Sequence, residues 1–220
     1  MAERKDLIII GGGEHARVVI ETARTRPDLW NLIGFTDPGP CDETLRRLGL
    51  PHLGGDDSFS RDRLASWYVL GVGGIGVSAV RHNVIRHYSD VASRWATIVH
   101  SNATISPTAQ LGTGTVVFAG ATVNSGAIVG DHCVVNTGAI IEHDVRLGSF
   151  TQVGPGAIIG GGATVGGGSY LGLGCRIRDH ICIGNRVLIG MGAVVVTSVE
   201  DELAVAGIPA KQIVTELASV

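Results

Sequence analysis

The 220-residue chain carries a formal net charge of -3, and its Lys and Arg residues are scattered along the sequence. This balance argues against a nucleic-acid-binding protein, which needs a basic surface to follow a phosphate backbone. Glycine is abundant, at 33 residues, and aromatic residues make up only 5%, so we expect tightly turning backbone and small core side chains. No stretch approaches the roughly 18 apolar residues of a membrane span and no signal-peptide core is present, so we expect a soluble, cytoplasmic protein.

The first 95 residues have the pattern of alternating strands and helices. We expect strands at 7–10, 32–36 and 67–72, with helices at about 16–25 and 77–93. This order is typical of a small parallel α/β unit of the nucleotide-binding, Rossmann-like type. The sequence therefore predicts an N-terminal domain that binds a nucleotide.

A glycine-rich turn follows the first expected strand. Gly11-Gly12-Gly13 precedes Glu14 and His15 at the start of a helix, where backbone amides and the helix N-terminus can stabilise a phosphate. The run lacks the third glycine of the dinucleotide-binding fingerprint, because Ala16 or Arg17 stands at that position. A nucleotide sugar therefore fits this turn better than a dinucleotide cofactor.

Two further segments end expected strands at the same edge of the sheet. Asp37 follows the second strand, where its carboxylate can accept hydrogen bonds from a ribose or a base. Gly73 and Gly74 follow the third strand and would complete the lip of the nucleotide site. Ordinary turn residues would fit these positions equally well, so a purely structural role stays open for both segments.

The second half is built on a six-residue repeat. Sixteen aliphatic residues recur at every sixth position from Ile105 to Val195, and none of them is polar. Neither the period of a helix nor that of a lone strand explains a strict six, whereas a triangular coil with one inward residue on each of three sides does. The repeat predicts a left-handed parallel β-helix over residues 96–200, entered by a strand at 95–99 and closed by a tail at 201–220.

The tripeptide Glu142-His143-Asp144 interrupts the small residues of the expected corners. Imidazole titrates near neutrality, so a corner histidine beside a carboxylate can accept a proton from an attacking amine or hydroxyl. Asp144 would orient the ring and stabilise the imidazolium as it forms. We interpret His143 as a general base and Asp144 as its partner, with Asn136 close by in the sequence.

A zinc site is an alternative reading of the histidines. His132 and His180 occupy equivalent corner positions and could be grouped with His143. The spacing lacks the close pair of histidines that β-helical carbonic anhydrases use. We therefore interpret His132 and His180 as solvated corner residues and expect no metal.

Four segments resemble the sugar O- and N-acetyltransferases, namely the sialic acid O-acetyltransferase group and the bacterial enzymes that acetylate a nucleotide-linked 4-amino-dideoxyhexose. The segments are 9–19, 33–37, 96–100 and 135–144, and the last is the most specific. The resemblance covers nearly the whole chain. It implies an acetyl-CoA-dependent acyltransferase that assembles as a homotrimer, with each active site between adjacent β-helices.

The resemblance also implies roles for individual residues. The nucleotide sugar would contact Gly13, Glu14, His15, Thr36, Asp37, Gly73 and Asn136, and acetyl-CoA would contact Gln152, Gly172, Gly190 and Lys211. Gln152 stands where some relatives have a second histidine that contacts acetyl-CoA. Lys211 lies in a C-terminal loop where a cation can meet the coenzyme phosphates. Glu14 stands where relatives often have glycine, which leaves its role open.

These observations together predict an N-acetyltransferase of polysaccharide biosynthesis that transfers the acetyl group directly to the amine of a nucleotide-linked sugar. The nearest alternative is an O-acetyltransferase acting on sialic acid or another sugar hydroxyl, because a general base serves either acceptor. A non-catalytic trimer that binds a nucleotide sugar is a further alternative, which Glu142-His143-Asp144 disfavours. The sequence does not distinguish UDP, GDP and dTDP as the nucleotide.

Overall fold

The computed structural model describes residues 4–39, 43, 46, 49–55, 66–74, 76–77, 79–89 and 94–214. The chain forms two compact units, one of Met1–Gly73 with Val80–Ser101 and one of Gly74–Ala79 with Asn102–Val220. The sequence suggested a single boundary near residue 95. The structure also assigns the short segment 74–79 to the second unit.

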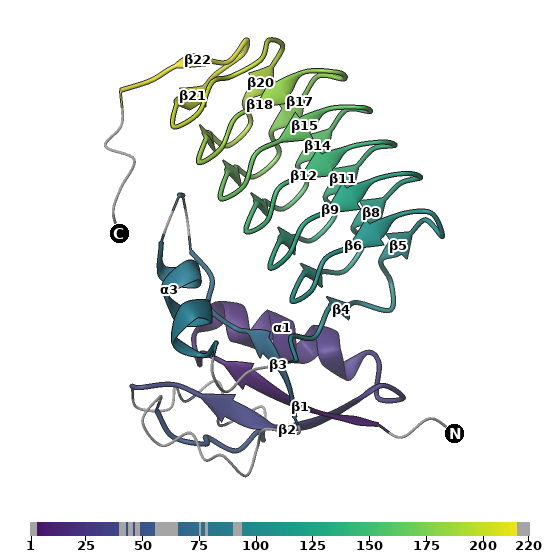
Figure 1. Ribbon diagram of the computed structural model, residues 1–220, viewed down its shortest axis with the longest axis vertical. Helices are drawn as coiled ribbons and strands as arrows, with labels where there is room; N and C mark the ends of the chain where they lie inside the picture. The colour runs from purple at the N-terminus through teal and green to yellow at the C-terminus, as the bar shows by residue number, and fades with distance from the viewer. Residues whose placement is uncertain are drawn as a thin grey trace. The chain divides into compact units, whose positions relative to one another are not determined.

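The first unit contains a three-stranded parallel sheet and two described helices (Figure 1). Its elements are β1 (Lys5–Ile10), α1 (Glu14–Arg24), β2 (Trp30–Thr36), β3 (Trp67–Leu70) and α3 (Val80–His87). Because β1 pairs with a strand on each side, its apolar run from Leu7 to Ile10 is buried. Both β3 and α3 are shorter than the sequence pattern predicted, and residues 78 and 90–93 of the expected second helix lie outside the described residues.

The strand order of this sheet is β2-β1-β3, so the order of the strands reverses at the central strand β1, beside the glycine-rich segments. The chain passes from the central β1 to β2 on one side and later to β3 on the other. Loops that leave such a sheet at the carboxyl ends of its strands diverge at this point, where open α/β sheets bind ligands. Residues 11–13 follow β1 and residues 71–73 follow β3, so the fold brings together both segments that the sequence singled out.

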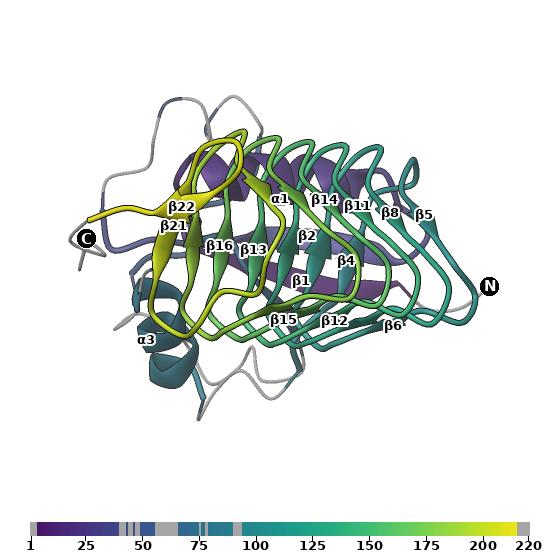
Figure 2. The same cartoon turned by 90° about the horizontal axis from the view of Figure 1, so that it is seen from above.

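The second unit is a left-handed parallel β-helix, as the repeat predicted (Figures 1 and 2). From β4 onward the strands are β4 (Ile98–Val99), β5 (Thr104–Ile105), β6 (Gln110–Leu111), β7 (Val116–Val117), β8 (Thr122–Val123), β9 (Ile128–Val129), β10 (Val134–Val135), β11 (Ile140–Ile141), β12 (Arg146–Leu147), β13 (Gln152–Val153), β14 (Ile158–Ile159), β15 (Thr164–Val165), β16 (Tyr170–Leu171), β17 (Arg176–Ile177), β18 (Cys182–Ile183), β19 (Leu188–Ile189), β20 (Val194–Val195), β21 (Ala204–Ala206) and β22 (Lys211–Gln212). They form sheets of eight, six and five strands. Each hexad residue from Ile105 to Val195 is the second residue of one strand.

The interior of the β-helix is filled by this hexad column. In each two-residue strand one side chain faces inward and the other outward. From Val117 to Val195 the inward residues are at most 4% exposed, whereas Ile105 and Leu111 in the first coil are partly exposed. Burial of one such aliphatic side chain contributes about 1.5–3 kcal/mol. The column is therefore the main source of stability for the second unit.

Three corners repeat from coil to coil. The glycine corner follows the strands of the eight-stranded sheet, the His143 corner follows those of the six-stranded sheet, and the Asn185 corner follows those of the five-stranded sheet. At the glycine corner the position with positive φ is always glycine, at residues 120, 138, 156, 174 and 192. At the His143 corner the same conformation is adopted by Asp144 (φ 59) and His180 (φ 54). Such backbone costs an ordinary residue about 1–2 kcal/mol, so these polar residues are held there against a local preference.

The last strands close the coil. The eight-stranded sheet continues from β19 to β21, and β22 then pairs antiparallel with β21 and so ends the parallel stack. The tail expected at 201–220 thus contains two strands before residue 215, beyond which the chain lies outside the described residues. In the part of the chain that the structure describes, no helix has the length and apolar character needed to cross a membrane.

Candidate active site

His143 and Asp144 make the central contact of the His143 corner. Nδ1 of His143 lies 3.0 Å from Oδ2 of Asp144, so the carboxylate orients the ring and holds a proton on Nδ1. Nε2 then keeps its lone pair and can accept a proton. The two side chains are 56% and 72% exposed, so a substrate can reach them. The pair has the geometry that a general base requires.

Two glycines on neighbouring coils leave the space that this pair occupies. One coil corresponds to 18 residues, as in the pairing of Ile140 with Ile158. One coil before Asp144 is Gly126, and one coil after His143 is Gly161. A Cβ at Gly161 would lie 2.5 Å from His143 Nε2, and a Cβ at Gly126 would overlap Asp144 Oδ1. The sequence analysis did not identify these two glycines, although their 18-residue distance from the His-Asp pair is the signal that locates them.

The backbone of Gly161 supplies a possible partner for a negative charge. Among the described residues its N–H has no hydrogen-bond acceptor, whereas the next amide, of Gly162, donates to the His143 carbonyl at 2.8 Å. An amide held beside a base can stabilise an oxyanion as it develops. The corner therefore offers a proton acceptor and a hydrogen-bond donor side by side.

Glu142 acts on the backbone of this turn. Its Oε2 accepts hydrogen bonds from Asn124 Nδ2 at 3.1 Å and from the His143 N–H at 3.4 Å. Asn124 lies one coil earlier and was not identified by the sequence analysis. The carboxylate of Glu142 thus joins two coils and fixes the turn that carries His143.

Asp37 ties β2 to the glycine run of the first unit. Its Oδ2 accepts a hydrogen bond from the Gly12 N–H at 2.7 Å, and its Oδ1 accepts one from the Gly39 N–H at 2.8 Å. A Cβ at Gly12 would lie 2.9 Å from the same Oδ2, which explains a glycine there. Both carboxylate oxygens already have backbone donors, so a ribose or base at Asp37 would share them.

Gly13 and Glu14 begin α1. Gly13 is the N-cap residue, no side chain caps the helix, and nothing lies within 4 Å of a Cβ placed on Gly13. The first amides of α1 and the open space beside them suit an anion. Glu14 is 89% exposed at its side chain and lies 3.4 Å from Arg17. This ion pair along the helix surface gives the acid of Glu14 a partner other than a ligand.

His15 lies against the loop that follows β3. A Cβ at Gly73 would come within 2.9 Å of His15 Cβ, so only glycine allows this approach. The pKa of His15 is lowered to about 3, chiefly by burial and secondly by the charge of Arg81. His15 is therefore an uncharged imidazole at neutral pH.

Thr36 has a structural position at the same edge. It is 1% exposed, and its hydroxyl lies 3.2 Å from the hydroxyl of Tyr88, just after α3. The contact joins the end of β2 to the end of α3. Thr36 therefore has a structural role at this edge of the sheet and is not exposed to a ligand.

The remaining predicted site residues do not gather around His143. Asn136 follows β10 at the glycine corner, where its Oδ1 accepts the Thr137 N–H at 2.8 Å. Gln152 lies on the side of β13 away from the inward-facing Val153, in the eight-stranded sheet, and is 9% exposed. That side of the triangular coil is opposite the His143 corner, which lies between the other two sheets. Lys211 is exposed on β22.

Gly172 and Gly190 are needed for the stacking of the coils. Their N–H groups donate to the carbonyls of Ile189 and Val205, each at 2.8 Å. A Cβ at Gly172 would lie 2.6 Å from the Ile189 carbonyl oxygen. The amides of these two glycines are therefore already used by the coil.

The free amides of the glycine corner belong to the residues that follow these glycines. Within the described residues, the N–H groups of Leu173 and Met191 have no acceptor. Their side chains are 49% and 78% exposed. The sequence analysis did not identify these two residues, which are apolar at exposed corner positions.

The Asn185 corner satisfies its own amides instead. The Thr113 N–H donates to Asp131 at 2.8 Å, the Gly167 N–H to Asn185 at 3.0 Å, and the Asn185 N–H to Asp201 at 2.8 Å. Polar side chains of adjacent coils thus take the place that a ligand could take. The other two corners differ, because some backbone N–H groups there have no acceptor among the described residues and can donate to a ligand.

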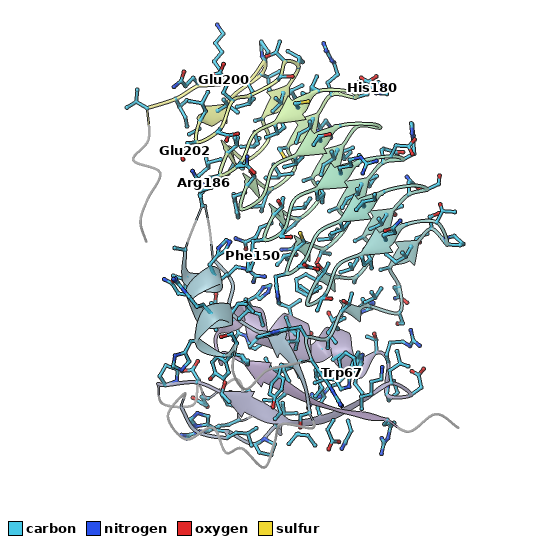
Figure 3. All side chains as sticks on the ribbon, in the orientation of Figure 1. Trp67, Phe150, His180, Arg186, Glu200 and Glu202 are labelled. Atoms are coloured by element: carbon cyan, nitrogen blue, oxygen red, sulfur yellow. The ribbon has the colours of Figure 1, made fainter. Side chains whose placement is uncertain are left out.

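The histidines considered for zinc are not assembled into a cluster. Within the described ranges, no group of three or more His, Cys, Asp or Glu residues is placed to hold a metal ion. The expectation that His132 is a solvated corner residue was wrong: it is 7% exposed, because its ring stacks on Phe150 with ring centroids 5.1 Å apart. His180 projects from a later turn of the His143 corner (Figure 3). Its ring covers Gly162, one coil earlier.

Comparison with known proteins identifies relatives of both units. Residues 6–88 match the family model described as the PglD N-terminal domain. The acetyltransferase domain of PglB from Neisseria gonorrhoeae FA1090, solved with acetyl coenzyme A, is 30% identical; the match covers 96% of this chain and 100% of that chain, with a TM-score of 0.84. No curated relative matches the chain.

Two further solved structures are similar over almost the whole chain. A variant of GDP-perosamine N-acetyltransferase from Caulobacter crescentus, in complex with CoA and GDP-perosamine, is 32% identical over 96% of this chain and 97% of that chain, with a TM-score of 0.84. WeeI from Acinetobacter baumannii AYE covers 95% of this chain and 100% of its own with a TM-score of 0.81, but at 21% identity it supports the fold alone.

A nucleotide-binding type of α/β unit joined to a β-helix with an imidazole–carboxylate corner defines an acyltransferase of the hexapeptide-repeat class. At this level of identity over nearly its full length, the chain belongs to the family of nucleotide-sugar acetyltransferases that contains the Neisseria and Caulobacter proteins.

Proposed function

We propose that the protein transfers the acetyl group of acetyl-CoA to the amino group of a nucleotide-linked 4-amino-dideoxy sugar. The observation that carries this proposal is the contact of His143 Nδ1 with Asp144 Oδ2, which leaves Nε2 beside the free amide of Gly161. The related Caulobacter enzyme is named for N-acetylation of GDP-perosamine, and its solved forms include variants with one histidine replaced by alanine or asparagine.

In the proposed reaction, the sugar amine attacks the thioester carbonyl carbon while His143 Nε2 accepts the proton that the amine loses. The carbon–sulfur bond then breaks, and the CoA thiolate leaves and takes up that proton. The products are the N-acetyl sugar and free CoA thiol. Asp144 stabilises the imidazolium in the interval. A placed base of this kind contributes ~10²–10⁴-fold to the rate.

The Gly161 amide is the proposed oxyanion donor. Its N–H has no acceptor in the described part of the chain. A backbone N–H that the fold leaves without an acceptor can donate to a ligand, and the carbonyl oxygen of the reacting thioester is the proposed partner. One such donor contributes ~10²–10³-fold.

The glycine corner is the proposed path of the pantetheine arm. Leu173 and Met191 lie one coil apart and present free amides and exposed apolar side chains. The arm has both amide groups and methylene chains, which match these two features. Lys211 stays the proposed contact of the coenzyme phosphates.

A homotrimer would complete the site. Within one chain, Gln152 and His143 lie on opposite sides of the β-helix, as the sheet order requires. If both contact the same acetyl-CoA, as we propose, they must come from different chains. A site shared between chains fits the homotrimer that the sequence resemblance implies.

O-acetylation is the second candidate, because His143 could deprotonate a sugar hydroxyl as well as an amine. Amino sugars linked to UDP, GDP and dTDP, and the same sugars with a hydroxyl in place of the amine, are incubated with acetyl-CoA and release of free thiol is followed. We expect turnover with an amine. Turnover with the hydroxyl sugars alone would contradict N-acetylation.

A further inference from the structure

Arg81 is the one Asp, Glu, Lys or Arg side chain that is buried among the described residues, at 2% exposed. It lies in the first turn of α3, just after the segment that leaves β3. Removing a guanidinium from water is costly unless hydrogen bonds and other interactions compensate. Its position therefore calls for an explanation.

A hydrogen bond connects Arg81 to the loop beside the glycine run. Nη1 of Arg81 donates to the carbonyl of Val72, which directly precedes Gly73. Gly73 in turn lies so close to His15 that a Cβ there would come within 2.9 Å of His15 Cβ. Arg81 thus fixes the peptide against which His15 rests.

Arg81 also acts on His15 through its charge. Among the charged groups of the described residues, Arg81 on α3 is the one whose charge acts on this imidazole, whereas Glu14 pairs with Arg17 and Asp37 accepts from Gly12. Burial and the charge of Arg81 together lower the pKa of His15. The field at the ring is therefore one that favours neutral imidazole.

We propose that Arg81 is a positioning residue of the nucleotide-sugar site, which holds Val72–Gly73 against His15 and places a permanent positive charge beside the loop that follows β3. The inference rests on the proposed function, because it takes the loop after β1 as the place of the substrate's diphosphate. An anion beside His15 alone would draw a proton onto the imidazole, and binding would then vary with pH. A guanidinium stays charged throughout this range, so the attraction for the diphosphate does not depend on pH.

The test measures binding of UDP-, GDP- and dTDP-glucose, which lack the reactive amine and whose diphosphate diesters do not titrate near neutrality. Calorimetry is performed at pH 5.5, 7.0 and 8.5 on the full chain and on Arg81→Gln and Arg81→Lys. For the wild type we expect an affinity that is the same at each pH. For Arg81→Gln we expect roughly tenfold weaker binding at each pH, as fits the loss of a nearby unit charge, because burial keeps His15 uncharged in this range. Arg81→Lys keeps the positive charge and should bind more tightly than Arg81→Gln.

The pKa of His15, measured by NMR on histidine-labelled protein, separates this role from a merely structural one. We expect it to rise in Arg81→Gln. Unchanged His15 titration, or wild-type affinity in Arg81→Gln, would overturn the inference alone. If no nucleoside diphosphate sugar binds the wild type, the proposed function fails with it. CoA binding checks that each variant is folded, and if Arg81→Gln does not fold, a wild-type affinity that increases on acidification would by itself overturn the inference.

Discussion

The imidazole of His143 covers Gly161, one coil further along the β-helix, so closely that a Cβ there would lie 2.5 Å from Nε2. Gly161 has no positive φ, so its backbone does not require glycine and the space for the ring does. In Gly161→Ala we expect kcat to fall by about 10²-fold, because a displacement of the base of about 1 Å has this effect. Steady-state kinetics at saturating substrates measures it.

The matched control is Gly167→Ala, at the same turn position of the Asn185 corner. A Cβ at Gly167 would lie 3.1 Å from the Ser149 carbonyl oxygen and far from His143. We expect kcat close to that of the wild type. Full activity of Gly161→Ala would show that the imidazole does not act from the position seen here.

Two variants at the glycine corner should separate the effect of coil stacking on stability from the effect of coenzyme binding on activity. In Gly172→Ala the new Cβ would lie 2.6 Å from both the Ile189 carbonyl oxygen and the Met191 nitrogen. We expect a loss of about 1–3 kcal/mol in the free energy of unfolding, as for other overpacked positions. Leu173→Ala, at an exposed side chain, should leave stability nearly unchanged and raise the KM for acetyl-CoA. Urea unfolding and kinetics measure the two effects, and a Gly172→Ala protein of wild-type stability would contradict the role in stacking.

The alternation of strands and helices in the first unit and the six-residue repeat in the second predict most of the fold. Each inward residue from Ile105 to Val195 lies in a strand of its own. A coil with three equal sides fixes both the six-residue period of the repeat and the side chain of each strand that faces inward. The association of segment 74–79 with the second unit had no counterpart in the sequence. It depends on packing such as that of Gly76 near Leu188, between residues over a hundred positions apart.

The candidate site was predictable where its residues are neighbours in the chain. His143 and Asp144 are adjacent, so their pairing followed from the sequence alone, although their role stays a prediction. Asn124, Gly126 and Gly161 act across coils and can be found only once the length of one coil is known. Glycine itself is ambiguous, because some positions need positive φ, others need space for stacking, and Gly161 needs space for a ring.

Two variants that each lack a different residue of a shared site should restore activity when they assemble together. If each site takes His143 from one chain and Gln152 from another, then His143→Ala and Gln152→Ala chains unfolded and refolded together should form some sites with both residues intact. We expect activity well above that of either variant alone. The control is each variant refolded by itself, and a mixture no more active than its components would contradict a shared site.

Acid should weaken the first unit through His15. Its pKa is lowered to about 3 in the folded protein, against the ordinary value of 6.5, chiefly by burial. Between these values the unfolded chain binds a proton that the folded chain does not, so stability falls as pH decreases from about 6.5 toward 3. Urea unfolding at several pH values, followed by the fluorescence of Trp30 and Trp67, measures the slope of the free energy of unfolding against pH. His15→Asn should reduce it, and an unchanged slope in this variant would refute the role of His15.

The central claim is that His143 accepts the proton from a nucleotide-linked amino sugar. The most direct test follows free thiol and N-acetyl product with acetyl-CoA and UDP-, GDP- and dTDP-linked 4-amino sugars, in wild type, His143→Ala and the control His180→Asn. We predict turnover of at least one sugar by the wild type and the control, and a kcat ~10²–10⁴-fold lower in His143→Ala with acetyl-CoA binding retained. Near-full turnover of His143→Ala at saturating substrates would contradict the account.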